Sequence, residues 1–133
     1  MGTKKKKEQI KQVGEQAQKE WKIILYEDEK GCPINDFMKT LLPIDNEKMI
    51  RWINYLKSVG NNIRRPQADF LRDKIYELRV ILTNNITRTL FFFYDDNEIV
   101  LTHTFIKKTQ KVPEKEIKKA IKYRKKYLQQ KNK

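Results

Sequence analysis

The sequence predicts an α+β domain: an antiparallel sheet with a two-helix hairpin on one face and a further helix at the C-terminal end. Apolar residues recur at helical spacing between residues 33 and 60 and again after residue 113. Between these segments lie three runs rich in β-branched and aromatic residues, separated by short turns that contain Asn or Asp. The 133 residues are enough for one domain with a modest core.

The two ends of the chain differ in composition from its middle. Residues 1–20 contain four consecutive lysines and only a narrow apolar stripe, so we expect a basic extension that is flexible or weakly helical. We expect the domain itself to span residues 21–128 and a basic tail to follow at 129–133. The first strand is expected at residues 21–26.

Two helices are predicted next. Pro33 opens a short helix and Pro43 ends it. Asp45 is expected to cap a longer helix, and Gly60 lies just beyond its end. The pair is expected to lie on the sheet as a hairpin. The following residues, 61–73, are polar and basic and are expected to form a loop. The apolar faces of the two helices are formed by Ile34, Phe37, Met38 and Leu41 and by Met49, Trp52, Ile53 and Leu56.

Three strands and a helix complete the predicted order. The strands are expected at residues 75–82, 86–94 and 98–106. The turns between them are rich in Asn and Asp, which tolerate the positive φ of tight hairpins, so the strands should form an antiparallel meander. The last helix is expected from Pro113 to about residue 128, because acidic residues begin it and lysines crowd its far end.

The charge of the chain favours a polyanionic partner. Thirty Lys and Arg against seventeen Asp and Glu give a formal net charge of +13. Nucleic acid or an acidic protein segment fits this excess, although a lysine-rich soluble protein of another kind has the same composition. Cys32 has no second cysteine to pair with, and no apolar run is long enough to cross a bilayer. We therefore expect a cytoplasmic protein without a secretory signal.

The residue inventory excludes several kinds of catalytic site. The chain has one histidine, one cysteine and one serine, so a zinc site of Cys and His ligands cannot be built within it. Its four glycines are scattered and form no phosphate-binding loop. We expect no metal and no cofactor. Catalysis would have to come from Arg, Lys, Tyr, carboxylates and the single His103.

Strand alternation predicts where the cations of the meander lie. Arg79 and Arg88 each share a strand face with apolar residues, and on the third strand Leu101, His103, Phe105 and Lys107 should share one face. If the registers agree, these groups converge opposite the helix hairpin, on an electropositive surface able to hold a phosphodiester. The alternative is a set of unrelated exposed charges on a solvated sheet face.

Two kinds of side chain on this sheet have more than one interpretation. His103 has the near-neutral pKa that suits proton transfer, but a lone strand histidine is also common as a structural group. Tyr94 and Tyr123 are candidates for stacking on a base. The run Phe91–Phe93 makes both faces of its strand aromatic, so each face needs a covering layer, and the C-terminal helix is a candidate for one of them.

Three segments resemble a known family. They are Ile-Tyr-Glu-Leu-Arg at 75–79, the strand from Arg88 to Tyr94, and Phe-Ile-Lys-Lys-Thr-Gln-Lys-Val-Pro at 105–113. Together they resemble the RelE/ParE toxin superfamily, most closely its phage-derived, HigB-like branch. The resemblance covers residues 21–128, and the predicted order of elements is also that of the family, which implies a RelE-like fold.

The resemblance implies a toxin of a type II toxin–antitoxin system that cuts mRNA, in many relatives on the ribosome. The implied chemistry is metal-free attack of a ribose 2′-hydroxyl on the neighbouring phosphate. Arg79 and Arg88 match phosphate-stabilising arginines, and Lys107 and Lys108 match a lysine pair with orienting or acid–base roles. His103 is a proton-transfer candidate, and the C-terminal tyrosine of some relatives has no clear match. Residues expected to contact RNA are Arg64, Arg65, Tyr94, Gln110 and Tyr123.

The resemblance also implies a cognate antitoxin with a helix-turn-helix domain as partner. Two other functions remain open for the sequence. ParE-like relatives inhibit DNA gyrase and cleave nothing, because one fold can serve several functions. A non-catalytic RNA-binding module would retain salt-dependent RNA affinity without turnover.

Overall fold

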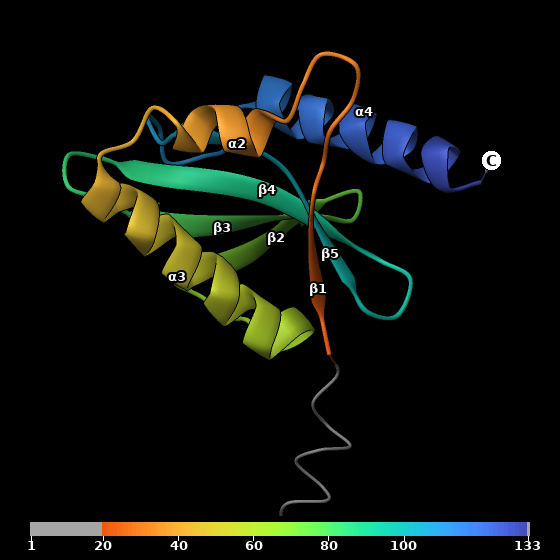
Figure 1. Ribbon diagram of the computed structural model, residues 1–133, viewed down its shortest axis with the longest axis horizontal. Helices are drawn as coiled ribbons and strands as arrows, with labels where there is room; N and C mark the ends of the chain where they lie inside the picture. Colours follow the sequence, from red (N-terminus) through yellow and green to blue (C-terminus); the bar gives the residue numbers. More distant parts are fainter. Residues whose placement is uncertain (1–19, 133) are drawn as a thin grey trace, which may run out of the picture.

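The computed structural model of the protein describes residues 20–132, and it has the α+β fold predicted from the sequence (Figure 1). The expected N-terminal extension lies outside these residues except for Glu20. The last helix continues to Lys131, so residues 129–131 of the expected tail are helical. The elements in chain order are β1 (Lys22–Leu25), α2 (Pro33–Met38), α3 (Pro43–Val59), the 3₁₀ turn η1 (Gly60–Asn62), β2 (Ala68–Arg72), β3 (Ile75–Ile81), β4 (Ile86–Tyr94), β5 (Glu98–Ile106) and α4 (Glu114–Lys131).

The sheet has five strands in the order β1-β5-β4-β3-β2. The predicted meander of β3, β4 and β5 is confirmed as antiparallel. The expectation of a wholly antiparallel sheet needs a correction, because β1 pairs with β5 in parallel from Lys22↔Glu98 to Leu25↔Leu101. These two strands are far apart in the sequence, so no local turn signal could indicate their relative direction.

The segment 61–73 is not only a loop, contrary to the sequence prediction. Its second half forms the edge strand β2, which pairs antiparallel with β3 from Ala68↔Leu78 onward. Asp73 and Lys74 make the connecting turn with φ values of 50° and 67°. Adjacent positive φ values suit the twist of a two-residue hairpin. The strand was missed because its few residues are flanked by charged and polar side chains.

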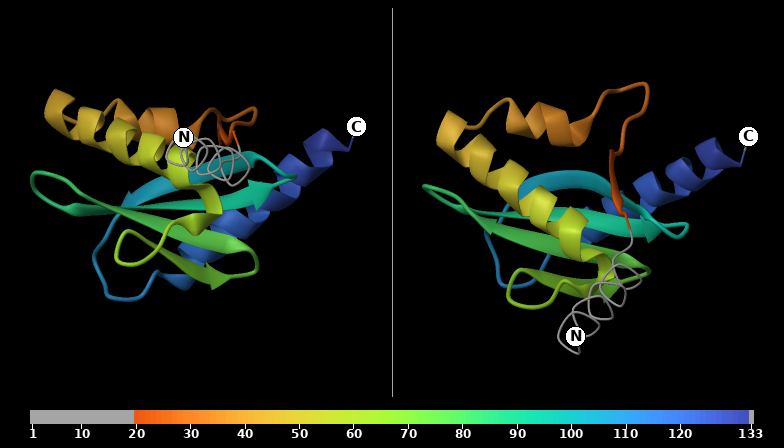
Figure 2. Two further views of the ribbon diagram at one scale, coloured as in Figure 1. Left: turned by 90° about the horizontal axis from the view of Figure 1, so that it is seen from below. Right: turned by 60° about the horizontal axis from the view of Figure 1, so that its bottom comes forward.

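Helices cover both faces of the sheet (Figure 2). On one face α2 and α3 pack on a core that includes Ile34, Met49 and Phe91. On the other face α4 packs on a second core that includes Phe92 and Ala120. The prediction that the aromatic run of β4 needs cover on both sides is confirmed, because Phe91 and Phe92 lie in opposite cores.

The two ends of α3 are held by different contacts. The predicted capping role of Asp45 is wrong: Leu42 occupies the N-cap position, and Asp45 lies buried in the first turn. There its carboxylate accepts hydrogen bonds from the backbone N–H and the hydroxyl of Thr83, at 2.9 and 2.8 Å. Gly60 ends the helix, as predicted, with φ of 57°. A Cβ at Gly60 would lie 2.0 Å from Nε1 of Trp21, so both the conformation and the space require glycine.

An irregular register between β4 and β5 changes which side chains share a face. Leu90 pairs with His103, whereas the next residue, Phe91, pairs with Leu101. Thr102 is therefore an extra residue in β5, as in a β-bulge. Leu101 joins the core under α2 and α3, while His103 contacts Glu116 and Tyr123 of α4. The predicted common face of Leu101 and His103 is thus wrong, because strict alternation fails at a bulge.

Candidate functional site

Arg79 and Arg88 lie directly opposite each other on β3 and β4, on one face of the sheet, as strand alternation predicts. Glu77 lies on the same face and contacts both. Its Oε1 accepts a hydrogen bond from Nη2 of Arg79 at 2.7 Å, and its Oε2 lies 3.2 Å from Nε of Arg88. The two guanidinium groups are therefore held close together by one shared carboxylate, which offsets their mutual repulsion.

Arg88 occupies the buried end of this cluster. It is 2% exposed, and Nη2 donates to the backbone oxygen of Gln110, in the segment between β5 and α4. The expectation of an exposed cation is wrong for Arg88, because that segment and α4 cover its face of the sheet. Within residues 20–132 its Nη1 has no hydrogen-bond partner. A buried donor without a partner costs about 1–3 kcal/mol, which offsets part of the stability that the contacts of Arg88 with Glu77 and Gln110 provide.

His103 is buried on the same face, 3% exposed. Its Nδ1 lies 3.0 Å from the hydroxyl of Thr102, and its Nε2 lies 3.3 Å from Oε1 of Glu116 on α4. Burial lowers the pKa of the imidazole to about 3, and the charge of Lys119 acts in the same direction. The ring is therefore neutral at pH 7. With a proton on Nε2 the ring donates to Glu116, whereas the single hydroxyl proton of Thr102 is shared between Nδ1 and the backbone oxygen of Leu90, which lies 3.0 Å from it.

Arg79 and Lys107 meet at a pocket of about 260 Å³ at the edge of the sheet, which we call the edge pocket. Arg79 is partly exposed, and its Nη1 donates to the backbone oxygen of Pro66 at 2.7 Å. Lys107 follows β5, and its backbone N–H donates to the oxygen of Ile86 at 2.7 Å. The residues that line the edge pocket are Lys48, Trp52, Pro66, Gln67, Arg79, Ile81, Ile86 and Lys107.

The electrostatics of the edge pocket favour an anion. Lys48, Arg79 and Lys107 line it, and none of the lining residues is acidic. Within the described part of the chain, neither Lys48 nor Lys107 forms an ion pair, whereas Arg79 is held by Glu77 and Asp69. Uncompensated charges around a concave surface raise the local potential and attract phosphate groups.

Sequence reasoning named only Arg79 and Lys107 among the residues that line the edge pocket, and the missed residues include Trp52 and Lys48. Trp52 was assigned to the core face of α3, but it is only partly buried. Lys48 lies one helical turn before it, so both side chains reach the same patch. The sequence contains a weak signal, a lysine four residues before a large aromatic residue on one helix. These two residues become part of a site only because α3 packs near the edge of the sheet, which the spacing alone does not predict.

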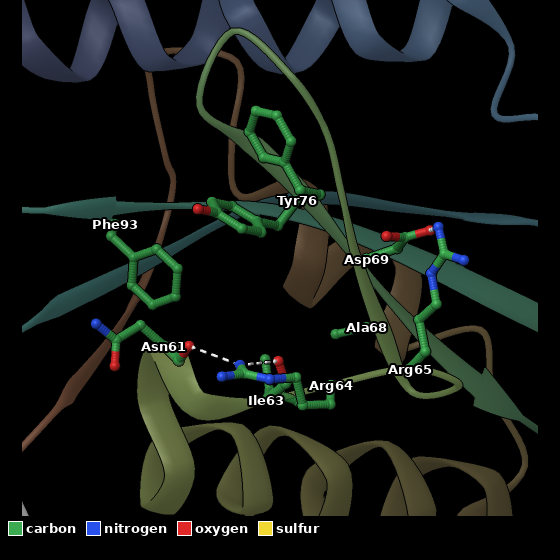
Figure 3. A pocket seen from close by; sticks show the side chains of 9 residues that line it. Asn61, Ile63, Arg64, Arg65, Ala68, Asp69, Tyr76 and Phe93 are labelled. Carbon is green, nitrogen blue, oxygen red and sulfur yellow. Dashed lines mark hydrogen bonds and ion pairs between the residues drawn. The ribbon is translucent and has the colours of Figure 1, made fainter.

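Arg64 and Arg65, predicted to contact RNA, lie at a second and larger pocket of about 550 Å³, which we call the loop pocket (Figure 3). Nη2 of Arg65 is 2.9 Å from the carboxylate of Asp69. Nη1 of Arg64 donates to the backbone oxygens of Asn61 and Ile63, at 3.3 and 3.1 Å. The lining residues are Asn61, Ile63, Arg64, Arg65, Ala68, Asp69, Phe70, Tyr76 and Phe93.

The other residues predicted to contact RNA line neither pocket. Tyr123 stacks on Tyr26 with ring centroids 4.4 Å apart, so the protein itself occupies one face of its ring. Tyr94 packs edge-on against Tyr127 at 5.3 Å. Lys108 and Gln110 are exposed in the segment between β5 and α4. The structure therefore brings Arg79 and Lys107 together and leaves the predicted tyrosines elsewhere.

Comparison with known families matches residues 36–125 to the family described as phage derived protein Gp49-like (DUF891). The match covers more than half of the chain, so the chain belongs to this family, which is part of the RelE/ParE-like toxin superfamily. A toxin family implies a cognate antitoxin as partner. No curated protein matches the chain. Among the described residues, no helix is both long and apolar enough to cross a bilayer.

Proposed function

We propose that this toxin is an endoribonuclease that cuts single-stranded mRNA at the edge pocket. The observation that supports the proposal is that Arg79 and Lys107, from two separate sequence motifs, line one pocket whose lining includes a third cation, Lys48, and no carboxylate. A scissile phosphate is the ligand that such a pocket suits, because its charge grows in the transition state. Ile81 and Trp52 supply apolar surface for the adjoining sugar or base.

The reaction that fits these residues is attack of a ribose 2′-oxygen on the adjacent phosphorus. A base removes the 2′-proton, a phosphorane forms, and the 5′-oxygen leaves with a proton, which gives a 2′,3′-cyclic phosphate and a 5′-hydroxyl. We assign Arg79 to the phosphorane oxygens, since contacts to Glu77 and Pro66 hold its guanidinium in place. Lys107, which lines the edge pocket, is assigned to proton transfer at the two ribose oxygens. Lys108 is exposed beside it and is assigned to orientation of the RNA.

Arg88 and His103 are proposed to position other groups in this structure. Both are almost fully buried, so neither reaches a substrate at the edge pocket. Arg88 contacts Glu77, which orients Arg79. His103 contacts Glu116 and so ties α4 to β5. Their substitution should therefore lower activity through the placement of other side chains.

The direct test is cleavage of mRNA by the purified chain, with and without ribosomes. The expected products have 2′,3′-cyclic phosphate or 3′-phosphate ends. Inhibition of gyrase supercoiling without any RNA cleavage would instead support the ParE-like alternative and overturn the proposal. Expression in bacteria should stop growth, and co-expression of an adjacent gene for a helix-turn-helix antitoxin should restore it.

A second candidate is a non-catalytic RNA-binding module. The burial of Arg88 and His103 favours it, because two of the five side chains first assigned to catalysis are inaccessible. Such a module would bind RNA in a salt-dependent manner and release it uncut. Parallel measurements of binding and single-turnover cleavage on the same RNA separate the two functions.

A further inference from the structure

We infer that the loop pocket binds one unpaired base of the RNA, next to the nucleotide whose phosphate lies in the edge pocket. The inference rests on the proposed function and names a binding site for a flanking nucleotide. The pocket, about 550 Å³, lies in the size range of small-ligand sites and has room for one nucleotide. Aromatic rings and arginines line it, and these are the side chains on which the unpaired bases of single-stranded RNA stack.

The aromatic wall of the loop pocket is suited to stacking. Phe70, on the edge strand β2, is 53% exposed, although burial of so large an apolar side chain would be favourable. Its ring meets Tyr76 edge-on at 5.0 Å, and Tyr76 stacks on the buried Phe91 at 5.5 Å. Phe93 packs edge-on against Tyr76 at 5.1 Å. These contacts hold the wall in place, so a base stacks on it with little loss of side-chain entropy.

Polar groups around the same pocket suit the rest of a nucleotide. Arg64 and Arg65 are exposed at the pocket; Arg64 lies across from Tyr76 and Phe93, where it can hold a phosphate, and Arg65 is turned toward Asp69 (Figure 3). Asp69 also lines the pocket, and its carboxylate holds the guanidinium of Arg65.

Asp69 also connects the two pockets. Its carboxylate lies 2.9 Å from Nη2 of Arg65 and 3.5 Å from Nη2 of Arg79, which lines the edge pocket. Pro66 lines the edge pocket and directly follows Arg65 in the chain. The two pockets are thus neighbours beside the start of β2. An unpaired strand can place a phosphate in one and a base in the other, whereas the bases of a duplex are stacked within it.

The test uses short single-stranded RNA that carries 2-aminopurine in place of one adenine and 2′-O-methyl groups that prevent cleavage. Stacking on the wall should quench the 2-aminopurine fluorescence on binding to the full chain. Phe70→Ala should remove the quenching and weaken binding about tenfold, because stacking on one ring is lost. Phe70→Trp should retain both. Ile50→Ala is the control, an exposed large apolar residue of α3 that lines neither pocket and should change neither.

Arg64→Ala should also weaken binding, and Arg51→Ala, an exposed arginine of α3, should do so less. A thermal melt of each variant shows whether it is folded. If folded Phe70→Ala binds the RNA with the parent affinity and the parent quenching, the inference is overturned. The same holds if Phe70→Ala loses only binding of an antitoxin, because the pocket then serves a protein partner.

Cleavage of unmodified RNA is measured separately, so that the two proposals fail separately. A parent chain that binds through Phe70 but cuts no RNA supports the base pocket and overturns the nuclease proposal. A parent chain that cuts RNA but binds equally well without Phe70 overturns the base pocket alone.

Discussion

Arg79 and Arg88 face each other across β3 and β4 and share the carboxylate of Glu77, yet their surroundings differ. The side chain of Arg79 is 27% exposed at the edge pocket, whereas that of Arg88 is 2% exposed under the segment that leads to α4. Identical residue types in adjacent register positions thus have different physical roles. Both arginines lie on the same face of the sheet, so the face does not decide whether a ligand can reach them. The segments that pack over each arginine decide whether its guanidinium is accessible to a ligand or contacts only protein groups.

The largest expected effect is the loss of stability when the buried arginine, Arg88, is replaced. Arg88→Ala should lower the free energy of unfolding by about 3–5 kcal/mol, because it empties the space of a fully buried side chain and removes one of the two cations that contact buried Glu77. Arg79→Ala should cost only about 1 kcal/mol, because the side chain of Arg79 is partly solvated and Glu77 keeps its contact with Arg88. Urea unfolding of both variants gives the comparison.

The double variant Glu77→Gln with Arg88→Met is the control for this pair. It removes both buried charges and should recover part of the stability lost in Arg88→Ala. Equal destabilisation by Arg79→Ala and Arg88→Ala would show that burial does not distinguish the two arginines.

Substitutions of the residues that line the edge pocket should have the largest effect on the rate of RNA cleavage. Arg79→Ala and Lys107→Ala should each lower single-turnover cleavage about a hundredfold, the effect of losing one preorganised donor. Their melting temperatures should change little, because both residues are partly exposed. Lys118→Ala, an exposed lysine of α4, is the control and should cleave at the parent rate. Parent-like cleavage by folded Lys107→Ala would place the reaction outside the edge pocket.

The burial of His103 should also make the stability of the fold depend on pH. The pKa of His103 is lowered to about 3, so between its unfolded value of 6.5 and about 3 the unfolded chain binds more protons than the folded one. Stability should therefore fall as pH drops through this range, by about 2 kcal/mol at pH 5 from this group. In His103→Gln that part of the loss should disappear. Urea unfolding at pH 7 and pH 5 measures it, and equal losses in parent and variant contradict the assignment.

The smallest expected effect is that of chelation. The proposed chemistry at the edge pocket uses only arginine and lysine, so EDTA should leave the cleavage rate unchanged under conditions that keep the ribosome intact. Free 5′-hydroxyl ends should form with and without the chelator. Loss of cleavage on chelation would contradict a metal-free reaction at this pocket.

Much of the fold follows from local patterns in the chain. Periodicity located α2, α3 and α4, and the Asn- and Asp-rich turns located β3, β4 and β5 within a residue of their observed bounds. Alternation also placed Arg79 and Arg88 on one face, because neither β3 nor β4 is interrupted between the residues concerned. The same rule failed for Leu101 and His103, because a bulge depends on how two strands align and not on one strand's sequence.

The sequence by itself determined the kinds of residue available for function: many cations, one histidine, one cysteine, and motifs that resemble those of a toxin superfamily. Only the tertiary structure decided which of those residues meet. In the folded chain Arg88 and His103 are buried, and Lys107 lines the edge pocket. Phe70, on the unpredicted strand β2, lines the loop pocket together with Arg64. The reason is physical: propensity and periodicity act over a few residues, whereas burial and pockets arise from contacts between segments far apart in the chain.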